Sequence, residues 1–478
     1  MDSRIKPKKE YINYIAVFFF CAFCITLFCK TSPLYVICDL ADTNTWLIQA
    51  RQILSGQIPY KDIYEHKGPL QMFAYLFAAL PCFKTFEGMY ITEIVLFFIF
   101  GVGVYKTSKL FGEKYNLIST IISLLITALS TAFSTTGSSE ELLLFTFIWS
   151  LYFMVKNIKS KAEFEPVSVI FIGAFFAIRL WTKYNLCFFD IILVVYTISV
   201  YIKNKWSIVK TIIYYLIGFA CVTAPILIYF TAKGALYDLF YVYFYTVIFK
   251  YSSTIGMDAE TEIVVIFPVI ILLLAFFVST LKNKKETEDF FMLSVFAVFS
   301  VFMFASSKWW SYYLLDVFVF AVYFVTKALN SNVKVFTAIF ALLVPMMLFF
   351  NDTQAETLKY SKSDYPQFEI AQVVNKTEDP KIYYYNAANA GFFVYSGNMP
   401  FAKYFTNYNI KLDEISRERN QILSNRVPDY IISYEDNSFD GYELALKREM
   451  PLFDVWYGLG KENRRQEIYL YEKTENTK

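Results

Sequence analysis

The apolar residues of this chain come in long uninterrupted blocks, and this arrangement restricts the possible folds more than any other feature. The blocks are about 17–22 residues long, the length that an α-helix needs to cross a hydrocarbon core of about 30 Å. Hydrophobic residues make up 56% of the chain and aromatic residues 20%. A soluble domain averages about 45–50% apolar residues and spreads them at helix or strand periods. The sequence therefore predicts a polytopic α-helical membrane protein.

The apolar runs predict about eleven transmembrane helices. They cover residues 11–29, 88–105, 115–134, 140–155, 165–181, 185–202, 207–231, 262–281, 289–306, 311–327 and 334–350. The first run follows a basic N-terminus and lacks a cleavage pattern, so we expect a retained signal-anchor helix. A shorter run at 70–83 is interpreted as an interfacial or re-entrant juxtamembrane helix.

The lysines set the orientation of these helices, because basic residues concentrate in cytoplasmic loops. If the N-terminus is cytoplasmic and the run at 70–83 does not cross, every basic cluster falls on the cytoplasmic side. These clusters lie around Lys8, Lys109, Lys159, Lys205, Lys284 and Lys334. The first loop, 30–87, and the C-terminal segment are then extracytoplasmic. The richness in Lys, Asn, Ile, Phe and Tyr is typical of an AT-rich bacterial genome, which favours the bacterial plasma membrane.

The composition predicts neither a nucleic-acid partner nor a disulfide framework. The net charge of +2 creates no global field that would attract nucleic acid. Most of the seven cysteines lie in apolar runs, and Cys21 and Cys24 are interpreted as packing residues within the first span. A disulfide framework is therefore not predicted.

The chain divides into a membrane domain, 1–350, and an extracytoplasmic domain, 351–478, which is long enough to have its own core. The second part contains strand-like runs at Lys381–Tyr385, Tyr430–Tyr434 and Glu467–Tyr471. A helical pattern covers Leu412–Leu423. These patterns predict a small α/β domain, which we assign to acceptor recognition or to support of a lid.

The first external loop begins with an amphipathic helix that can lie along the membrane face. Trp46, Leu47 and Ala50 recur at helical spacing, and Gly56 provides a C-terminal cap. Asp42 lies at the start of this helix, close to Asp39. Asp42 can be an ordinary N-cap, or it can accept a proton from an acceptor hydroxyl at the mouth of the membrane. Spacing alone leaves the two interpretations equal.

A group of ionisable residues follows this helix. Asp62, Glu65, His66 and Lys67 precede Gly68-Pro69, at which the short juxtamembrane helix starts. Lys67 can be an interfacial anchor, and a lone histidine is often a surface residue. So many ionisable groups between two membrane-facing helices nevertheless favour a site.

Two further segments contain polar residues at external faces. Ser138-Ser-Glu-Glu141 opens a predicted span, and Lys308 and Tyr312 belong to Lys308-Trp-Trp-Ser-Tyr-Tyr-Leu-Leu315. Together with Asp42-x₈-Arg51-x-x-Leu-x-Gly56 and the Glu65–Pro69 segment, they resemble the motifs of GT-C glycosyltransferases. That superfamily includes the protein O-mannosyltransferase-like group and the bacterial transferase that adds aminoarabinose to lipid A. Here His66 is inserted, Gly68 replaces the first proline, and Asp316 stands where proline is usual.

The resemblance implies an inverting transfer of a sugar from a polyprenyl phosphate to a hydroxyl of a glycan, lipid or protein. By this resemblance, Asp42 holds and deprotonates the hydroxyl, with Asp39 as the alternative base. The cations neutralise the leaving phosphate in a water-poor site. They are Lys67, assisted by Arg51, Arg179, Lys183 and Lys308.

A divalent cation is also a candidate cofactor. Asp39, Glu65, His66, Glu140 and Glu141 could together bind one. Oxygen ligands suit magnesium or manganese, and a histidine would admit zinc.

Three other functions compete with a sugar transferase. A flippase would need charged residues along a path through the bundle, whereas here they gather at one face. A polymerase or ligase of lipid-linked polysaccharide has similar chemistry. A non-catalytic subunit that displays the C-terminal domain is the third alternative.

Overall fold

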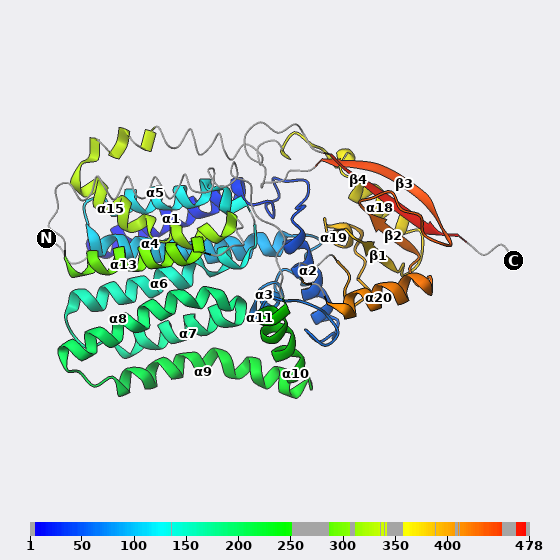
Figure 1. The fold of residues 1–478 in the computed structure, drawn as a ribbon. Helices are drawn as coiled ribbons and strands as arrows, with labels where there is room; N and C mark the ends of the chain where they lie inside the picture. Colours follow the sequence, from blue (N-terminus) through cyan, green and yellow to red (C-terminus); the bar gives the residue numbers. More distant parts are fainter. Residues whose placement is uncertain are drawn as a thin grey trace.

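The computed structural model describes residues 5–134, 136–250, 286–305, 311–334, 336–338, 340–341, 357–387, 389–406, 410, 412–451 and 465–474. The predicted boundary at 350/351 and Lys308 lie outside these ranges, as does the whole predicted span at 262–281. A bundle of roughly parallel helices forms one end of the molecule. A mixed α/β domain forms the other end, opposite the N-terminus (Figure 1).

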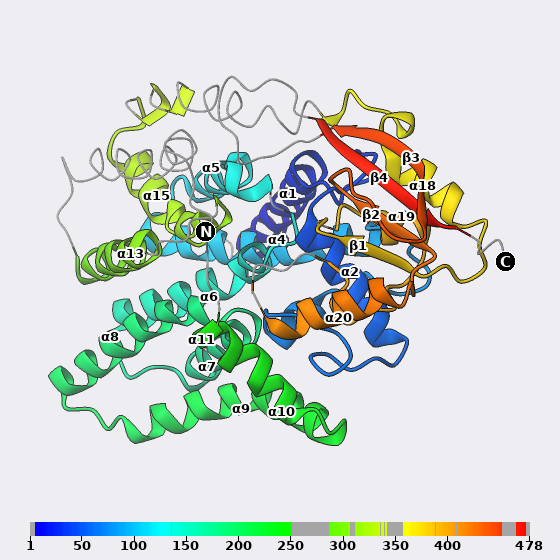
Figure 2. The same cartoon turned by 45° about the vertical axis from the view of Figure 1, so that its right-hand side comes forward.

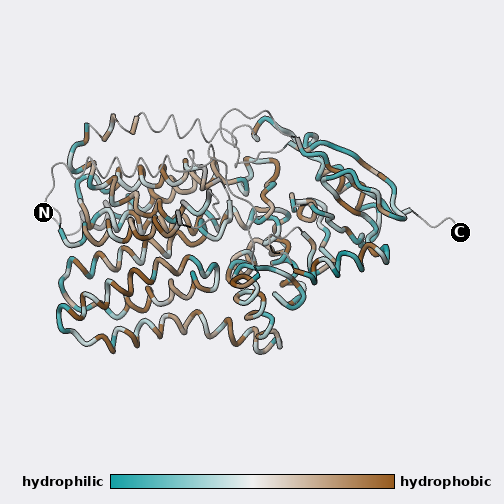
Figure 3. Tube along the Cα trace, in the orientation of Figure 1, coloured by the Kyte–Doolittle hydropathy of each residue, from teal (hydrophilic) through white to brown (hydrophobic). Residues whose placement is uncertain are grey.

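Most of the bundle consists of helices that coincide with the predicted apolar runs. They are α1 (Ile5–Phe28), α4 (Glu87–Phe111), α5 (Asn116–Leu129), α6 (Ser139–Ser160), α7 (Pro166–Thr182), α8 (Phe188–Asn204), α9 (Val209–Ala232), α13 (Thr287–Ala305) and α15 (Ala321–Ser331). Among the described residues, 5 helical segments are long and apolar enough to cross a membrane: Glu10–Phe28, Glu87–Phe111, Ser139–Ser160, Tyr184–Asn204 and Val209–Ala232. Helices α5 and α7 are shorter but also apolar. Figure 3 shows hydrophobic residues along these helices and hydrophilic ones at the loops and over the α/β domain.

Short elements connect or end the long helices. The predicted span at 311–327 is broken into a 3-10 turn (Ser311–Leu314), α14 (Leu315–Phe318) and the start of α15. After α9, α10 (Leu236–Leu239) leads through a π-helical turn (Phe240–Thr246) into α11 (Val247–Lys250). The run at 70–83 contains only α3 (Pro69–Ala74) as helix. Six residues of helix rise about 9 Å, so α3 is too short to cross a membrane, as predicted.

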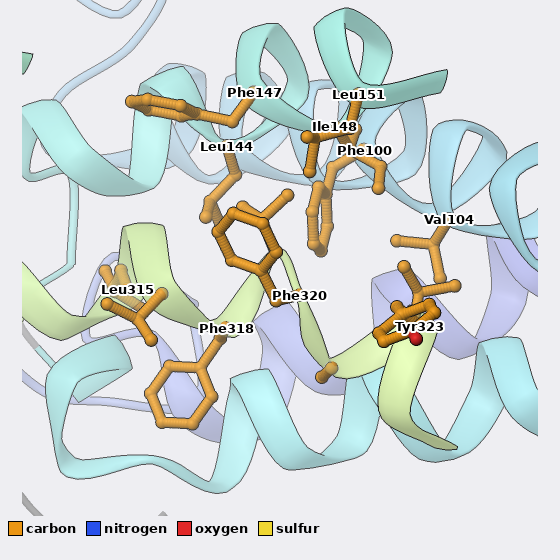
Figure 4. Packing of buried hydrophobic residues seen from close by; sticks show 14 of the residues in the cluster. Phe100, Val104, Leu144, Phe147, Ile148, Leu151, Leu315, Phe318, Phe320 and Tyr323 are labelled. Atoms are coloured by element: carbon orange, nitrogen blue, oxygen red, sulfur yellow. The ribbon is translucent and has the colours of Figure 1, made fainter. Parts of the chain in front are cut away.

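The centre of the bundle is a large apolar cluster contributed by most of the helices. Figure 4 shows side chains of α4, α6 and the α14–α15 segment packed against one another: Phe100, Val104, Leu144, Phe147, Ile148, Leu151, Leu315, Phe318, Phe320 and Tyr323. Close packing of this kind, rather than exclusion of water, holds membrane helices together. It fixes the ends of α6 and α7 that carry the polar residues Glu140 and Lys183.

The C-terminal domain is a four-stranded sheet with helices. The strands are β1 (Ile382–Tyr385), β2 (Tyr430–Ser433), β3 (Tyr442–Pro451) and β4 (Arg465–Lys473), in the order β1-β2-β4-β3. β1 and β2 are parallel, and the other pairs are antiparallel, with Ile431 opposite Tyr471. The helices are α18 (Pro366–Val374), α19 (Phe392–Ser396) and α20 (Asp413–Ser424). The three predicted strands and the predicted helix are therefore present, and β3 was not predicted.

Helix α2 (Ala41–Leu54) lies between the bundle and the C-terminal domain (Figures 1 and 2). Trp46 and Leu47 belong to one buried cluster with Ile382 and Phe392 of the C-terminal domain. The polar side is also covered, because Asn44, Gln49 and Gln52 are buried. The predicted helix is therefore present, and its amphipathic pattern also joins two parts of the protein. Its position along the membrane face stays a prediction.

Candidate functional site

Asp42 and Asp39 occupy different surroundings at the start of α2. Leu40 is the N-cap of α2, so Asp42 lies within the first turn and is not the N-cap that spacing allowed. The Asp42 side chain is exposed. The carboxylate of Asp39 instead forms an ion pair with Lys30, with 2.7 Å between Nζ and Oδ1. Of the two predicted bases, Asp42 is the one open to an acceptor.

Glu65 is the buried centre of the ionisable group. Its Oε2 accepts a hydrogen bond from the indole N–H of Trp46 at 3.1 Å. Its Oε1 accepts the backbone N–H groups of His66 at 2.8 Å and Lys67 at 3.0 Å. Burial raises the pKa of Glu65, and the nearby charge of Asp42 adds to this effect. Because α2 supplies Trp46, this helix fixes the turn at 65–67 from one side.

His66 and Lys67 project from that turn. Burial, together with the charges of Lys67 and Lys183, lowers the pKa of His66 well below its ordinary value, so the imidazole is neutral at pH 7. Lys67 is half-buried, and within the described part of the chain its ammonium forms no ion pair. Its backbone is held by the Tyr60 hydroxyl, which donates to the Lys67 carbonyl oxygen at 2.7 Å. Lys67 is therefore an oriented cation that can take an anionic ligand.

Gly68 joins this turn to the C-terminal end of α7. Its N–H donates to the carbonyl oxygen of Thr182 at 2.9 Å. A Cβ atom at Gly68 would lie 2.0 Å from the carbonyl oxygen of Trp181, so the close contact requires glycine. Pro69 then starts α3. This contact brings the 65–67 turn towards Lys183, which directly follows α7.

Lys183 and Glu140 form a buried ion pair at the same end of the bundle. The Lys183 ammonium also lies 4.1 Å from the ring centre of Tyr313 and 5.1 Å from that of Tyr312. Lys183 and Tyr312, both predicted site residues, thus come together, but the charge of Lys183 already has a partner. Asp316 is buried nearby, and its carboxylate oxygens have no hydrogen-bond partner among the described residues.

The two arginines predicted to bind phosphate have partners within the protein. Arg179 is 0% exposed, and its guanidinium forms two hydrogen bonds with Asp190. The Arg51 guanidinium donates to the carbonyl oxygen of Lys84 at 2.7 Å. Both arginines thus have partners within the protein, and their role as helpers of Lys67 stays a prediction.

The residues predicted to bind a divalent cation do not converge. Asp39 pairs with Lys30, and Glu140 pairs with Lys183. Glu141 follows Glu140 on α6 but belongs to another buried group, with Cys29 and Glu93, which is the one cluster of metal-ligating type found in the described ranges. The predicted set therefore does not fit one ion.

Glu93 and Asp316 are two buried acids that we did not predict as site residues. Both occur inside apolar runs that predict membrane spans. An ionisable residue inside a span is costly and is a functional candidate on that ground alone. This signal was present in the sequence.

Comparisons with known proteins support the fold. No family model matches the chain, and no curated protein matches it. A crystal structure of ArnT from Cupriavidus metallidurans bound to undecaprenyl phosphate superposes with a TM-score of 0.61 at 11% identity, over 96% of this chain and 98% of that one. ArnT from the same organism in the apo state gives a TM-score of 0.62 at 11% identity, over 97% and 98%. The chain thus has the fold of ArnT over almost its whole length, and the resemblance drawn from the first external loop is confirmed at the level of the fold.

Proposed function

We propose that the protein is an inverting glycosyltransferase that moves a sugar from a polyprenyl-phosphate donor to a hydroxyl acceptor on the non-cytoplasmic side. The fold shared with ArnT supports this proposal, since one of those structures contains undecaprenyl phosphate. The observation that carries it is the half-buried Lys67 ammonium, which forms no ion pair in the described ranges. Lys30 and Lys183, by contrast, are both paired with carboxylates.

The roles follow from the surroundings of each residue. Lys67 binds the donor phosphate and stabilises the charge that develops as it leaves. Asp42, the exposed carboxylate, orients the acceptor hydroxyl and takes its proton. Glu65 is a positioning residue, because its Oε1 holds the backbone that presents Lys67. Glu65 and Asp42 lie close enough for their charges to interact.

The proposed orientation places the C-terminal domain and the first loop outside the cytoplasm, in a bacterial plasma membrane. The N-terminus and the C-terminal domain lie at opposite ends of the bundle (Figure 1). Lys109, near the C-terminal end of α4, pairs with Glu10, and Lys159, near the C-terminal end of α6, pairs with Glu288. We assign these basic loops to the cytoplasmic side. We further propose the division into domains 1–350 and 351–478, with the second contacting the acceptor.

The proposal is tested by sugar transfer from a panel of polyprenyl-phosphate sugars to cell-envelope glycan, lipid and protein acceptors. We expect Asp42→Asn to abolish transfer while donor binding persists. Lys67→Met should weaken donor binding by about 10- to 150-fold, because a hydrogen bond to a charged group contributes about 1.5–3 kcal/mol. Lys61→Met is the matched control, since Lys61 is an exposed lysine of the same loop.

Three outcomes would contradict the assignment. Unchanged transfer by Asp42→Asn would remove Asp42 as the base and leave Asp39 to be tested. An equal loss in Lys61→Met and Lys67→Met would show that loop charge in general, rather than Lys67, attracts the donor. No transfer from any donor, with movement of the lipid-linked sugar across a vesicle membrane, would establish a flippase instead.

A further inference from the structure

A second group of buried side chains lies on the other side of the first turn of α6. It consists of Cys29, just after α1, Glu93 of α4 and Glu141 of α6. One possible ligand atom from each residue lies within 4.8 Å of the others. The three residues are 0%, 1% and 5% exposed. None of them has a role in the proposed transfer reaction.

The hydrogen bonds of this group leave one carboxylate oxygen without a partner. The Thr31 hydroxyl donates to Glu93 Oε2. The N–H of Gly137 donates to Glu141 Oε2 at 2.7 Å, and the Cys29 thiol lies 3.8 Å from Glu141 Oε1. Glu93 Oε1 is buried and has no hydrogen-bond partner among the described residues. An unpaired buried oxygen of this kind needs a partner such as a proton, a water molecule or an ion.

No cation of the described chain neutralises these two carboxylates. Lys30, the nearest lysine in sequence to Cys29, pairs with Asp39, and Lys183 pairs with Glu140. Two buried carboxylates with oxygens within 4.8 Å of each other cannot both stay ionised without a positive charge between them. They must therefore hold at least one proton, shared or not, or bind a cation. Protonation explains the two carboxylates but gives no reason for a thiol beside them.

The third side chain decides between these two possibilities. A thiolate is a soft ligand that selects zinc and related transition metals, whereas magnesium and calcium prefer oxygen alone. Sulfur and carboxylate oxygen are both common zinc ligands. We propose that Cys29, Glu93 and Glu141 bind one divalent transition-metal ion of the zinc class. Binding would release the thiol proton and the proton held by the carboxylates.

Such an ion would brace the loop that supports the candidate site. Glu141 holds the backbone of Gly137, and the carbonyl oxygen of Gly137 accepts the Tyr75 hydroxyl at 2.8 Å. The neighbouring Thr136 carbonyl oxygen accepts the hydroxyl of Thr43, from α2, at 2.5 Å. The metal would thus link α1, α4 and α6 beneath α2. This role is structural, and it does not depend on the identity of the reaction.

Cobalt(II) is the probe, because cobalt bound to a thiolate shows a sulfur-to-metal charge-transfer band in the near ultraviolet. The full chain is purified with Cys82→Ser and Cys221→Ser, since these two cysteines are exposed and would bind metal at the surface. After chelator treatment, we expect one equivalent of cobalt, the charge-transfer band, and displacement of cobalt by zinc but not by magnesium.

Two variants and one control assign the site. Cys29→Ser should lose the charge-transfer band. Glu93→Gln should weaken cobalt binding by at least about 10- to 100-fold. Removing a group that only hydrogen-bonds to a metal ligand already has an effect of that size, and Glu93 is proposed as a ligand itself. Cys24→Ser, the control, changes a buried thiol of the same helix end that lies outside the cluster, and it should keep both properties.

The Cys82→Ser/Cys221→Ser parent protein can overturn the proposal without any further variant. No stoichiometric cobalt uptake by the folded, chelator-treated parent would leave protonation as the explanation of the cluster. A charge-transfer band that survives in Cys29→Ser, or unchanged affinity in Glu93→Gln, would place the metal elsewhere. Gel filtration and circular dichroism establish folding for each protein. If Cys29→Ser does not fold, the parent spectrum and Glu93→Gln decide the question.

Discussion

The ion pair between Arg179 and Asp190 offers a test of whether this arginine serves structure or catalysis. Arg179 Nε lies 2.8 Å from Asp190 Oδ2, and a second guanidinium nitrogen bonds to the other carboxylate oxygen. The guanidinium carbon also lies 4.9 Å from the ring centre of Phe147 and 5.3 Å from that of Phe189. The side chains of Arg179 and Asp190 are 0% and 2% exposed. The perturbation that we consider is Asp190→Asn, which removes the negative charge and keeps the shape.

The expected cost is set by the buried charge that the substitution leaves behind. Removing one partner of a buried ion pair costs about 3–5 kcal/mol, because the other charge is left uncompensated. The rings of Phe147 and Phe189 contact the guanidinium in both proteins, so their contribution cancels in the difference. We therefore expect Asp190→Asn to lose about 3–5 kcal/mol of stability. At about 2 °C per kcal/mol for a large domain, the unfolding midpoint should fall by about 6–10 °C.

A double-mutant cycle measured by thermal unfolding in detergent checks this reasoning. Arg179→Met alone should also destabilise the protein, because it leaves the carboxylate of Asp190 buried without a partner. The double variant Arg179→Met/Asp190→Leu should recover most of the loss, since an apolar pair of similar volume can replace a buried ion pair. Transfer per folded molecule should stay at the wild-type level in that double variant. A stable Asp190→Asn protein, or a stable double variant without transfer, would refute the structural role.

Three further predictions concern the first loop. Gly68→Ala should lower both the unfolding midpoint and transfer, because its Cβ would lie 2.0 Å from the Trp181 carbonyl oxygen; unfolding and transfer assays check this. The depressed pKa of His66 means that the unfolded chain takes up a proton near pH 6.5 while the folded chain does not, so stability should fall as the pH drops below about 6.5. His66→Gln should flatten this part of the stability curve, and an unchanged curve would contradict the neutral assignment of the only histidine. Tyr395→Phe removes the oxygen that accepts the Cys38 N–H at 2.7 Å and should cost about 1–3 kcal/mol, measured by unfolding and by faster proteolysis between the C-terminal domain and the bundle.

Local patterns were sufficient where one segment determines its own structure. The apolar blocks located the long helices, because a span needs only length and hydrophobicity. The runs at 382–385 and 430–433 form buried strands, β1 at an edge of the sheet and β2 inside it, and both were predicted. Strand β3 was missed because most of its residues are exposed. Its charged, weakly alternating sequence, Tyr442–Pro451, lacks the period-two signal that a half-buried strand gives.

Contacts between residues far apart in the sequence could not be predicted from local patterns. The amphipathic pattern of α2 could not reveal that Trp46 packs in one cluster with Ile382 and Phe392, which lie more than 300 residues later in the chain. The turn at Glu65–Lys67 was predicted as a site because its ionisable groups are contiguous. Which cations are already neutralised was not predictable, because the partners of Lys30, Arg179 and Lys183 depend on the packing of several helices. Lys67 is distinguished from them by its contacts and not by its sequence.

The two neighbouring carboxylates of α6 connect the candidate site with the buried Cys29 group. Successive residues of an α-helix project about 100° apart, so Glu140 and Glu141 necessarily face different neighbours. Glu140 meets Lys183, and Glu141 meets Cys29 and Glu93. The Ser138 hydroxyl accepts the N–H of Glu141 at 3.2 Å and so fixes where the helix begins. A shift of the helix start by one residue would misplace both carboxylates at once. Any ligand that holds Glu141 therefore also holds Glu140 against Lys183, and through it the electrostatic field beside Lys67.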